Sequence, residues 1–209
     1  MSENSTRQPG FIRHVPNLLT IARLGMTAVI LGLILYAPRT GQEKPANWLL
    51  GAFILFVIAG LTDIVDGHIA RRFNATSKFG RTIDPLADKV LVCGAFICFA
   101  IVGQPRLTHL HFPEWAGDLI RWTIAAILLL REVVVQTLRH IAESRGINFG
   151  AVVWGKIKMF LQSFGIGTVL IGWAYVSRPW GDWFTLITFG LMAAITVISG
   201  IDALKRPIK

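Results

Sequence analysis

Residues 62–89 read TDIVDGHIARRFNATSKFGRTIDPLADK and decide the fold, because they place four carboxylates inside an otherwise strongly apolar chain. The first pair, Asp63 and Asp66, has the spacing i, i+3. The second pair, Asp84 and Asp88, has the spacing i, i+4. At either spacing the two side chains share one face of a helix, and the polar segment between the pairs is typical of a helix end and a turn. The sequence therefore predicts a helical hairpin that directs both pairs into one acidic pocket.

The rest of the chain has the composition of an all-α integral membrane protein. Of its 209 residues 53% are hydrophobic, the mean hydropathy is +0.56, and the apolar residues form blocks close to membrane-spanning length. We expect a single domain over residues 1–209, in which residues 1–17 are either an interfacial amphipathic segment or an ordinary basic flank. Gly165, Gly167 and Gly172 indicate close helix packing. Six transmembrane helices are predicted at roughly 18–37, 48–72, 82–103, 118–140, 153–176 and 183–203.

The charge distribution predicts the orientation in the membrane. Most of the 21 Lys and Arg residues lie in segments on the same side as the N-terminus. By the positive-inside rule, both termini and the acidic pocket face the cytoplasm, and we expect a multi-pass protein of the cell inner membrane. The net charge of +9 follows from this topology. Nucleic-acid binding is disfavoured, since no soluble basic domain is present to carry it. An aromatic belt at the outer helix ends is predicted from Trp48, Trp115, Trp122, Trp180 and Trp183.

The four carboxylates would repel one another and take up protons unless cations neutralise them. Oxygen-only ligands suit Mg²⁺ or Mn²⁺, and four carboxylates suffice for the two ions commonly used in phosphoryl displacement. At 1.5 Å per helical residue, all four lie in the cytoplasmic leaflet, where a lipid headgroup and a water-soluble substrate can meet. Gly67 would allow close approach of a ligand, and Arg71 could reach a phosphate. The simpler alternative is a hydrogen-bonded carboxylate cluster without function.

These residues form a known signature, and the chain resembles the CDP-alcohol phosphotransferases. The signature DxxDGxxARx8GxxxDxxxD is matched position for position by Asp63, Asp66, Gly67, Ala70, Arg71, Gly80, Asp84 and Asp88. Within the family, similarity to members that use glycerol 3-phosphate extends along most of the chain. It includes VPNLLTIAR at 15–23, IDPLADKVLV at 83–92, RE at 131–132, LR at 138–139 and GKIKMFLQ at 155–162. Met159 departs from the pattern, because threonine is common there.

The resemblance implies a six-helix, usually dimeric membrane enzyme. Such an enzyme would transfer the phosphatidyl group of CDP-diacylglycerol to sn-glycerol 3-phosphate, giving phosphatidylglycerolphosphate and CMP. By the resemblance, Asp63 and Asp84 would bridge two metal ions, while Asp66 would complete one and Asp88 the other. Asp88 would also be the general base. The CDP-lipid would be contacted by Gly67, Arg71, Ser77 and Asn17.

A candidate acceptor site lies outside the signature. Arg131 and Arg139 are eight residues apart and share a helix face, and Arg131 lies too deep in its helix to be a simple topology charge. With Lys156 and Lys158 they could bind the phosphate of glycerol 3-phosphate. The alternative for Arg139, Lys156 and Lys158 is a positive-inside role. For Arg131 it is an ion pair with Glu132 or with another helix.

Two other functions remain open from the sequence. A cardiolipin synthase of the same family would use phosphatidylglycerol as its acceptor, and it would need a second groove for acyl chains. An ion transporter would also place carboxylates in the membrane. The transporter is disfavoured because all four acids lie in one leaflet and have no polar continuation through the outer halves of the second, third and fourth helices.

Overall fold

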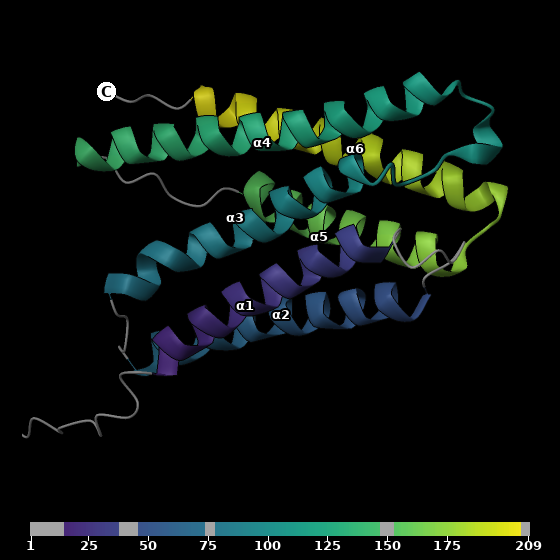
Figure 1. Ribbon diagram of the computed structural model, residues 1–209. Coiled ribbons are helices and arrows are strands. Elements are labelled where there is room, and N and C mark those ends of the chain that lie inside the picture. The colour runs from purple at the N-terminus through teal and green to yellow at the C-terminus, as the bar shows by residue number, and fades with distance from the viewer. Residues whose placement is uncertain (1–14, 38–45, 74–77, 147–152, 206–209) are drawn as a thin grey trace, which may run out of the picture.

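In the computed structural model the described residues form six long helices, and successive helices run in opposite directions (Figure 1). The structure describes the backbone of residues 15–37, 46–73, 78–146 and 153–205, and the side chains of these residues except 15–20, 63–73, 78–86, 114 and 153. Every regular element in this part of the chain is helical. The elements are α1 (Val15–Tyr36), α2 (Ala46–Phe73), α3 (Lys78–Ile101), η2 (Thr108–Leu110), α4 (Glu114–Ser144), α5 (Val153–Tyr175) and α6 (Pro179–Leu204).

The structure has a helix at each of the six predicted positions, and several of these helices extend farther than the sequence indicated. α3 begins at Lys78 instead of 82, and α4 exceeds the predicted 118–140 at both ends. α6 begins at Pro179 instead of 183, because proline suits the first helical position, where its missing N–H needs no partner. α4 ends where Gly146 adopts a φ of +72°, a left-handed conformation that glycine adopts without strain. The predicted spans left these polar and proline-containing helix ends out.

The helices pack as a ring. Its order is α1, α2, α5, α6, α4, α3 and back to α1, and α3 also contacts α5 across the ring. Because the helices alternate in direction, the starts of α1, α3 and α5 share one end of the bundle with the ends of α2, α4 and α6 (Figure 1). We call this the carboxylate end, since the signature segments of α2 and α3 lie there. The opposite end is called the tryptophan end.

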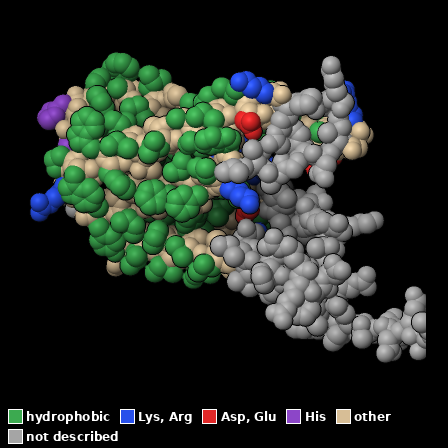
Figure 2. Space-filling model, turned by 180° about the vertical axis from the view of Figure 1, so that it is seen from behind, with side chains coloured by type: hydrophobic (Ala, Val, Ile, Leu, Met, Phe, Trp, Pro, Cys, Tyr) green, Lys and Arg blue, Asp and Glu red, His purple; other side chains and the backbone are tan. Residues whose placement is uncertain are grey.

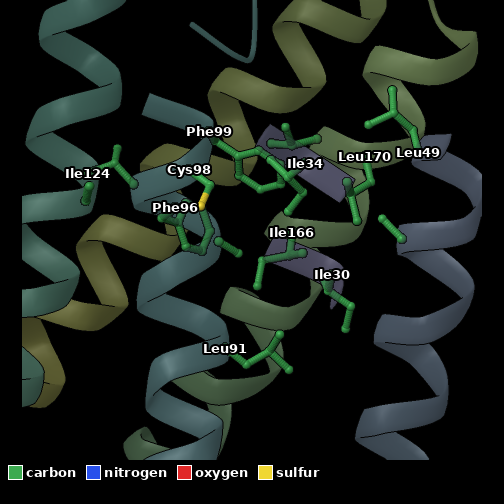
Figure 3. Packing of buried hydrophobic residues seen from close by; sticks show 14 of the residues in the cluster. Ile30, Ile34, Leu49, Leu91, Phe96, Cys98, Phe99, Ile124, Ile166 and Leu170 are labelled. Atoms are coloured by element: carbon green, nitrogen blue, oxygen red, sulfur yellow. The ribbon is translucent and has the colours of Figure 1, made fainter. Parts of the chain in front are cut away.

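An apolar core fills the half of the ring toward the tryptophan end. Figure 3 shows Ile34 from α1, Phe99 from α3 and Leu170 from α5 directed toward one another. Phe96 of α3 packs edge-on against Phe99 and against Phe189 of α6, with ring centroids 6.1 and 5.9 Å apart. All six helices contribute residues to this core.

Toward the carboxylate end, the buried positions on three helices become polar. Buried polar side chains are costly unless they form hydrogen bonds or ion pairs, or bind a ligand. They continue the helix faces that carry the core, since on each helix they are separated from the nearest core residue and from one another by three or four residues. This half of the bundle is therefore built around polar groups. The residues are Arg23 and Thr27 on α1, Lys158 and Gln162 on α5, and Thr196 and Ser199 on α6.

The outer surface is apolar over much of its area (Figure 2). Leu130 and Phe160, for example, are 68% and 69% exposed. Among the described residues, Trp154–Tyr175 and Pro179–Leu204 are long and apolar enough to cross a membrane, and two other apolar helices are shorter. The five predicted belt tryptophans are all exposed and lie near the starts of α2, α4 and α6, toward the tryptophan end. The all-helical prediction is thus confirmed together with two candidate membrane spans.

The glycines of α5 differ in their surroundings. A Cβ atom at Gly165 would lie 3.3 Å from Sδ of Met192 and 3.4 Å from Cζ of Phe96. A Cβ atom at Gly167 would lie 3.2 Å from Cε2 of Phe53, whereas one at Gly172 would meet nothing within 4 Å. The predicted close packing is confirmed at the first two positions and is wrong at the third.

Gly165→Leu is expected to destabilise the protein, because the added side chain would have to displace Met192 and Phe96. Overpacking of this kind costs about 1–3 kcal/mol, which corresponds to a thermal midpoint lower by roughly 3–10 °C. Thermal unfolding in detergent measures the shift. Gly172→Leu, on the same helix but facing open space, is the matched control, and equal shifts in both variants would contradict the packing explanation.

Candidate functional site

The signature is divided between two consecutive helices. α2 carries the first carboxylate pair and α3 the second, and the end of α2 and the start of α3 both lie at the carboxylate end (Figure 1). The helical state predicted for both pairs is therefore confirmed. The side chains of Asp63, Asp66 and Asp84 lie outside the described residues. So do the predicted CDP-lipid contacts of Asn17, Gly67, Arg71 and Ser77.

Asp88 has a described side chain that is partly exposed and directed toward α1. Its carboxylate is 32% exposed, and Oδ1 lies 3.6 Å from Nη1 of Arg23, whose side chain is only 1% exposed. A buried guanidinium therefore borders the acidic site and holds the carboxylate between α1 and α3. Arg23 was not among the predicted site residues. The only feature of the sequence that could have indicated it is its position at the end of the VPNLLTIAR stretch.

A second charged group lies on the other side of α3. We call it the Glu132 cluster, and it consists of Lys89, Arg131, Glu132 and Lys158. Oε2 of Glu132 accepts hydrogen bonds from Nζ of Lys158 and from Nη1 of Arg131, the latter at 3.2 Å. Oε1 lies 3.7 Å from Nζ of Lys89. Three cations from α3, α4 and α5 thus surround one carboxylate, and none of the four side chains is more than 24% exposed.

Neutral groups extend the cluster to a fourth helix. Nη2 of Arg131 donates to Oγ of Ser199 on α6 at 2.5 Å, and Nζ of Lys89 donates to Oε1 of Gln136 on α4. The stem of Arg131 also passes close to Gly200, where an added Cβ would lie 3.4 Å from its Cγ. The guanidinium is therefore held by contacts from two helices, a precondition for a precise binding site.

The structure brings together only part of the predicted acceptor site. Arg131 and Lys158 converge on Glu132, which confirms the ion pair considered for Arg131. Lys156 lies two residues before Lys158 on α5 but is exposed, whereas Lys158 is buried. Arg139 lies farther along α4, and within the described chain its buried Nε, like that of Arg131, has no hydrogen-bond partner. Buried donors nearly always have a partner, so these two are available to a bound oxygen ligand.

The acidic site and the Glu132 cluster are neighbours on α3. Asp88 faces Arg23 on α1, while the next residue, Lys89, faces Glu132 and Gln136 on α4. Consecutive helical residues point about 100° apart, so α3 presents one group to each side. Figure 2 shows Lys, Arg, Asp and Glu side chains where the apolar surface ends. An anion held by the cluster would therefore lie beside the helix that carries Asp88. Lys89 had no predicted role, and Glu132 was predicted only as a possible ion-pair partner of Arg131.

The four predicted metal ligands are all carboxylates on α2 and α3. In the described part of the chain, no three His, Cys, Asp or Glu side chains are grouped so that they could hold a metal ion. Asp88 belongs to that part, and the other three predicted ligands have side chains outside it. Four carboxylates at helical spacing on two helices provide only oxygen donors, which fits Mg²⁺ or Mn²⁺.

Comparisons with known proteins agree with the signature. Residues 13–199 match the family model of CDP-alcohol phosphatidyltransferase. The chain is 33% identical over 203 residues to the CDP-diacylglycerol–glycerol-3-phosphate 3-phosphatidyltransferase of Bacillus subtilis, covering 92% of this chain and 94% of the relative. It is 31% identical to the protein of the same name from Rickettsia bellii, with the same coverage. A probable phosphatidylglycerophosphate synthase of Mycobacterium tuberculosis is 29% identical, over 95% of this chain and 83% of the relative.

Proposed function

The chain belongs to the CDP-alcohol phosphatidyltransferase family, and from this premise we propose that it transfers the phosphatidyl group of CDP-diacylglycerol to sn-glycerol 3-phosphate. The products are phosphatidylglycerolphosphate and CMP. The observation that carries the choice of acceptor is the Glu132 cluster, in which three cations meet a single carboxylate beside α3. Such an excess of positive charge suits a phosphate dianion. The names of the relatives support the same acceptor over phosphatidylglycerol, the substrate of a cardiolipin synthase.

The acceptor phosphate is bound by Arg131 and Lys158. Arg139 lies farther along α4 and Lys156 is exposed, so neither belongs to this pair. Arginine supplies a planar fork of donors for phosphate oxygens, and Lys158 supplies a buried point charge. The nucleotide and lipid phosphates are contacted by Arg71, with Gly67, Ser77 and Asn17 as further contacts.

The reaction is a displacement at the lipid-linked phosphorus. The acceptor hydroxyl oxygen forms a new bond to that phosphorus, the bond to the CMP oxygen breaks, and Asp88 accepts the hydroxyl proton. Two Mg²⁺ or Mn²⁺ ions would be held by Asp63, Asp66, Asp84 and Asp88. When bound, such ions neutralise the diphosphate and the charge on the leaving group.

We place the enzyme in the cell inner membrane as a multi-pass protein with six spans, and as a homodimer. The carboxylate end and both termini face the cytoplasm, where glycerol 3-phosphate and CMP are soluble. Support comes from the excess of Lys and Arg on that side, the exposed tryptophans at the opposite end and the apolar outer surface.

The proposal is tested by CMP release from purified protein with CDP-diacylglycerol and Mg²⁺, in separate reactions with glycerol 3-phosphate, phosphatidylglycerol, serine or inositol phosphate. We expect release only with glycerol 3-phosphate, and a lipid product that carries a second phosphate. Release only with phosphatidylglycerol would assign cardiolipin synthesis instead. Release with none of the acceptors would contradict the transferase assignment.

A further inference from the structure

Glu132 is the carboxylate at the centre of a cationic site. Its Oε2 atom accepts from both Lys158 and Arg131, so the charged ends of these two side chains converge on a single oxygen. Its Oε1 atom draws Lys89 from α3 to the same place. Glu132 is 17% exposed and lies on α4, where it faces cations of α3 and α5 as well as its neighbour Arg131. The carboxylate is therefore the group that the three positive charges share.

Without this carboxylate, the cations would lose the arrangement that brings them together. Lys158 is 5% exposed, and its ion pair is with Glu132. Like charges repel, and lysine has a flexible stem whose ammonium has no preferred direction of its own. Arg131 would keep its bond to Ser199, and Lys89 its bond to Gln136. Lys158 would be left buried beside Arg131 with no counter-charge.

We propose that Glu132 is a positioning residue for the acceptor phosphate, an inference that rests on the proposed function. Glu132 carries the same sign of charge as phosphate and therefore does not bind it. It holds Arg131 and Lys158 so that their remaining N–H groups converge where the phosphate binds, and it offsets part of the repulsion between them when the site is empty. Glycerol 3-phosphate binding depends on this arrangement, whereas CDP-diacylglycerol binding, which we assign to residues outside the Glu132 cluster, does not.

The test compares Glu132→Gln, Glu132→Asp and the matched control Glu143→Gln, an exposed carboxylate on the same helix. We expect Glu132→Gln to raise the KM for glycerol 3-phosphate by at least about tenfold, because a buried cation loses its partner. The kcat and the KM for CDP-diacylglycerol should change less than about twofold, because sites that share no partners are only weakly coupled. Glu132→Asp retains the charge and should restore most of the affinity. Glu143→Gln should resemble the wild type.

Three outcomes would overturn the proposal. A lower KM for glycerol 3-phosphate in Glu132→Gln would mean that the carboxylate competes with the phosphate. A parallel change in kcat and in both KM values would indicate a merely structural role, and so would failure of Glu132→Asp to restore the affinity. Failure of the proposed function is a separate result, because it is seen in the wild type as CMP release that does not depend on glycerol 3-phosphate.

A second measurement does not require turnover. Inorganic phosphate should raise the unfolding temperature of the wild-type protein in detergent, because it binds the folded site. The same phosphate concentration should produce a clearly smaller rise in Glu132→Gln than in Glu143→Gln. If both variants respond equally, Glu132 does not order the phosphate ligands. If Glu132→Gln does not fold, Glu132→Asp should retain most of the wild-type response to phosphate, and loss of that response would overturn the proposal.

Discussion

Asp88→Asn is expected to reduce CMP release by about 10²–10⁴-fold, the usual contribution of a general base. The amide is nearly isosteric with the carboxylate but cannot accept the proton of the attacking hydroxyl, and it is a poor ligand for a hard metal ion. Asp88 is partly exposed, and Arg23 on α1 holds it in place, so the substitution should change its chemistry more than its packing. The rate is measured with both substrates saturating.

The control for this variant is Asp118→Asn. Asp118 also pairs with an arginine, Arg121, but it is exposed and lies at the tryptophan end. We expect its activity to remain close to that of the wild type. If Asp88→Asn retained more than a tenth of the wild-type rate while folding normally, the role assigned to Asp88 would be incorrect. A loss of rate in both variants would point to a general loss of structure.

Arg131→Gln is expected to raise the KM for glycerol 3-phosphate by about 10–100-fold, since a hydrogen bond to a charged group contributes about 1.5–3 kcal/mol. The guanidinium is 13% exposed and already donates to Glu132 and Ser199, so it is oriented before the acceptor binds. Arg131→Lys keeps the charge but loses the planar fork, and it should fall between the wild type and the glutamine variant. The KM for CDP-diacylglycerol should change little. Steady-state kinetics with each substrate varied separately measure these effects.

Arg121 provides a matched control for Arg131. It lies on the same helix, is 11% exposed, and pairs with Asp118 and with the carbonyl of Pro105 near the tryptophan end. Arg121→Gln therefore removes an equally buried arginine far from the Glu132 cluster. If Arg121→Gln weakened glycerol 3-phosphate binding as much as Arg131→Gln, the effect would come from general destabilisation of α4. The phosphate would then not depend on Arg131.

The sequence predicted the helices well because long apolar blocks and helical spacing are local properties. The two carboxylate pairs lie on the expected helices, α2 and α3, and the family follows from their spacing. Helix ends were less accurate where they depend on single residues. For example, α6 already begins at Pro179, and α4 continues almost to the turn at Gly146, in both cases beyond the apolar block.

The polar contacts between helices could not be predicted in the same way. An apolar stripe shows that a helix face is buried, but it does not identify the neighbouring helix. Lys156 and Lys158 look alike in the sequence, yet only Lys158 faces Glu132, because two residues on a helix differ by about 200° in direction. Arg23 and Lys89 likewise had the appearance of ordinary cytoplasmic charges until α1 and α4 were placed against α3.

The sequence by itself determined the family, the all-helical architecture and the helices that carry the carboxylates, because a fixed spacing of rare residues in an apolar chain is readable without tertiary contacts. Only the tertiary structure decided which charges meet. Glu132 joins Lys89 of α3 and Lys158 of α5 to Arg131, its neighbour on α4. Ion pairs of this kind depend on how helices pack around one another, and that packing results from the whole core.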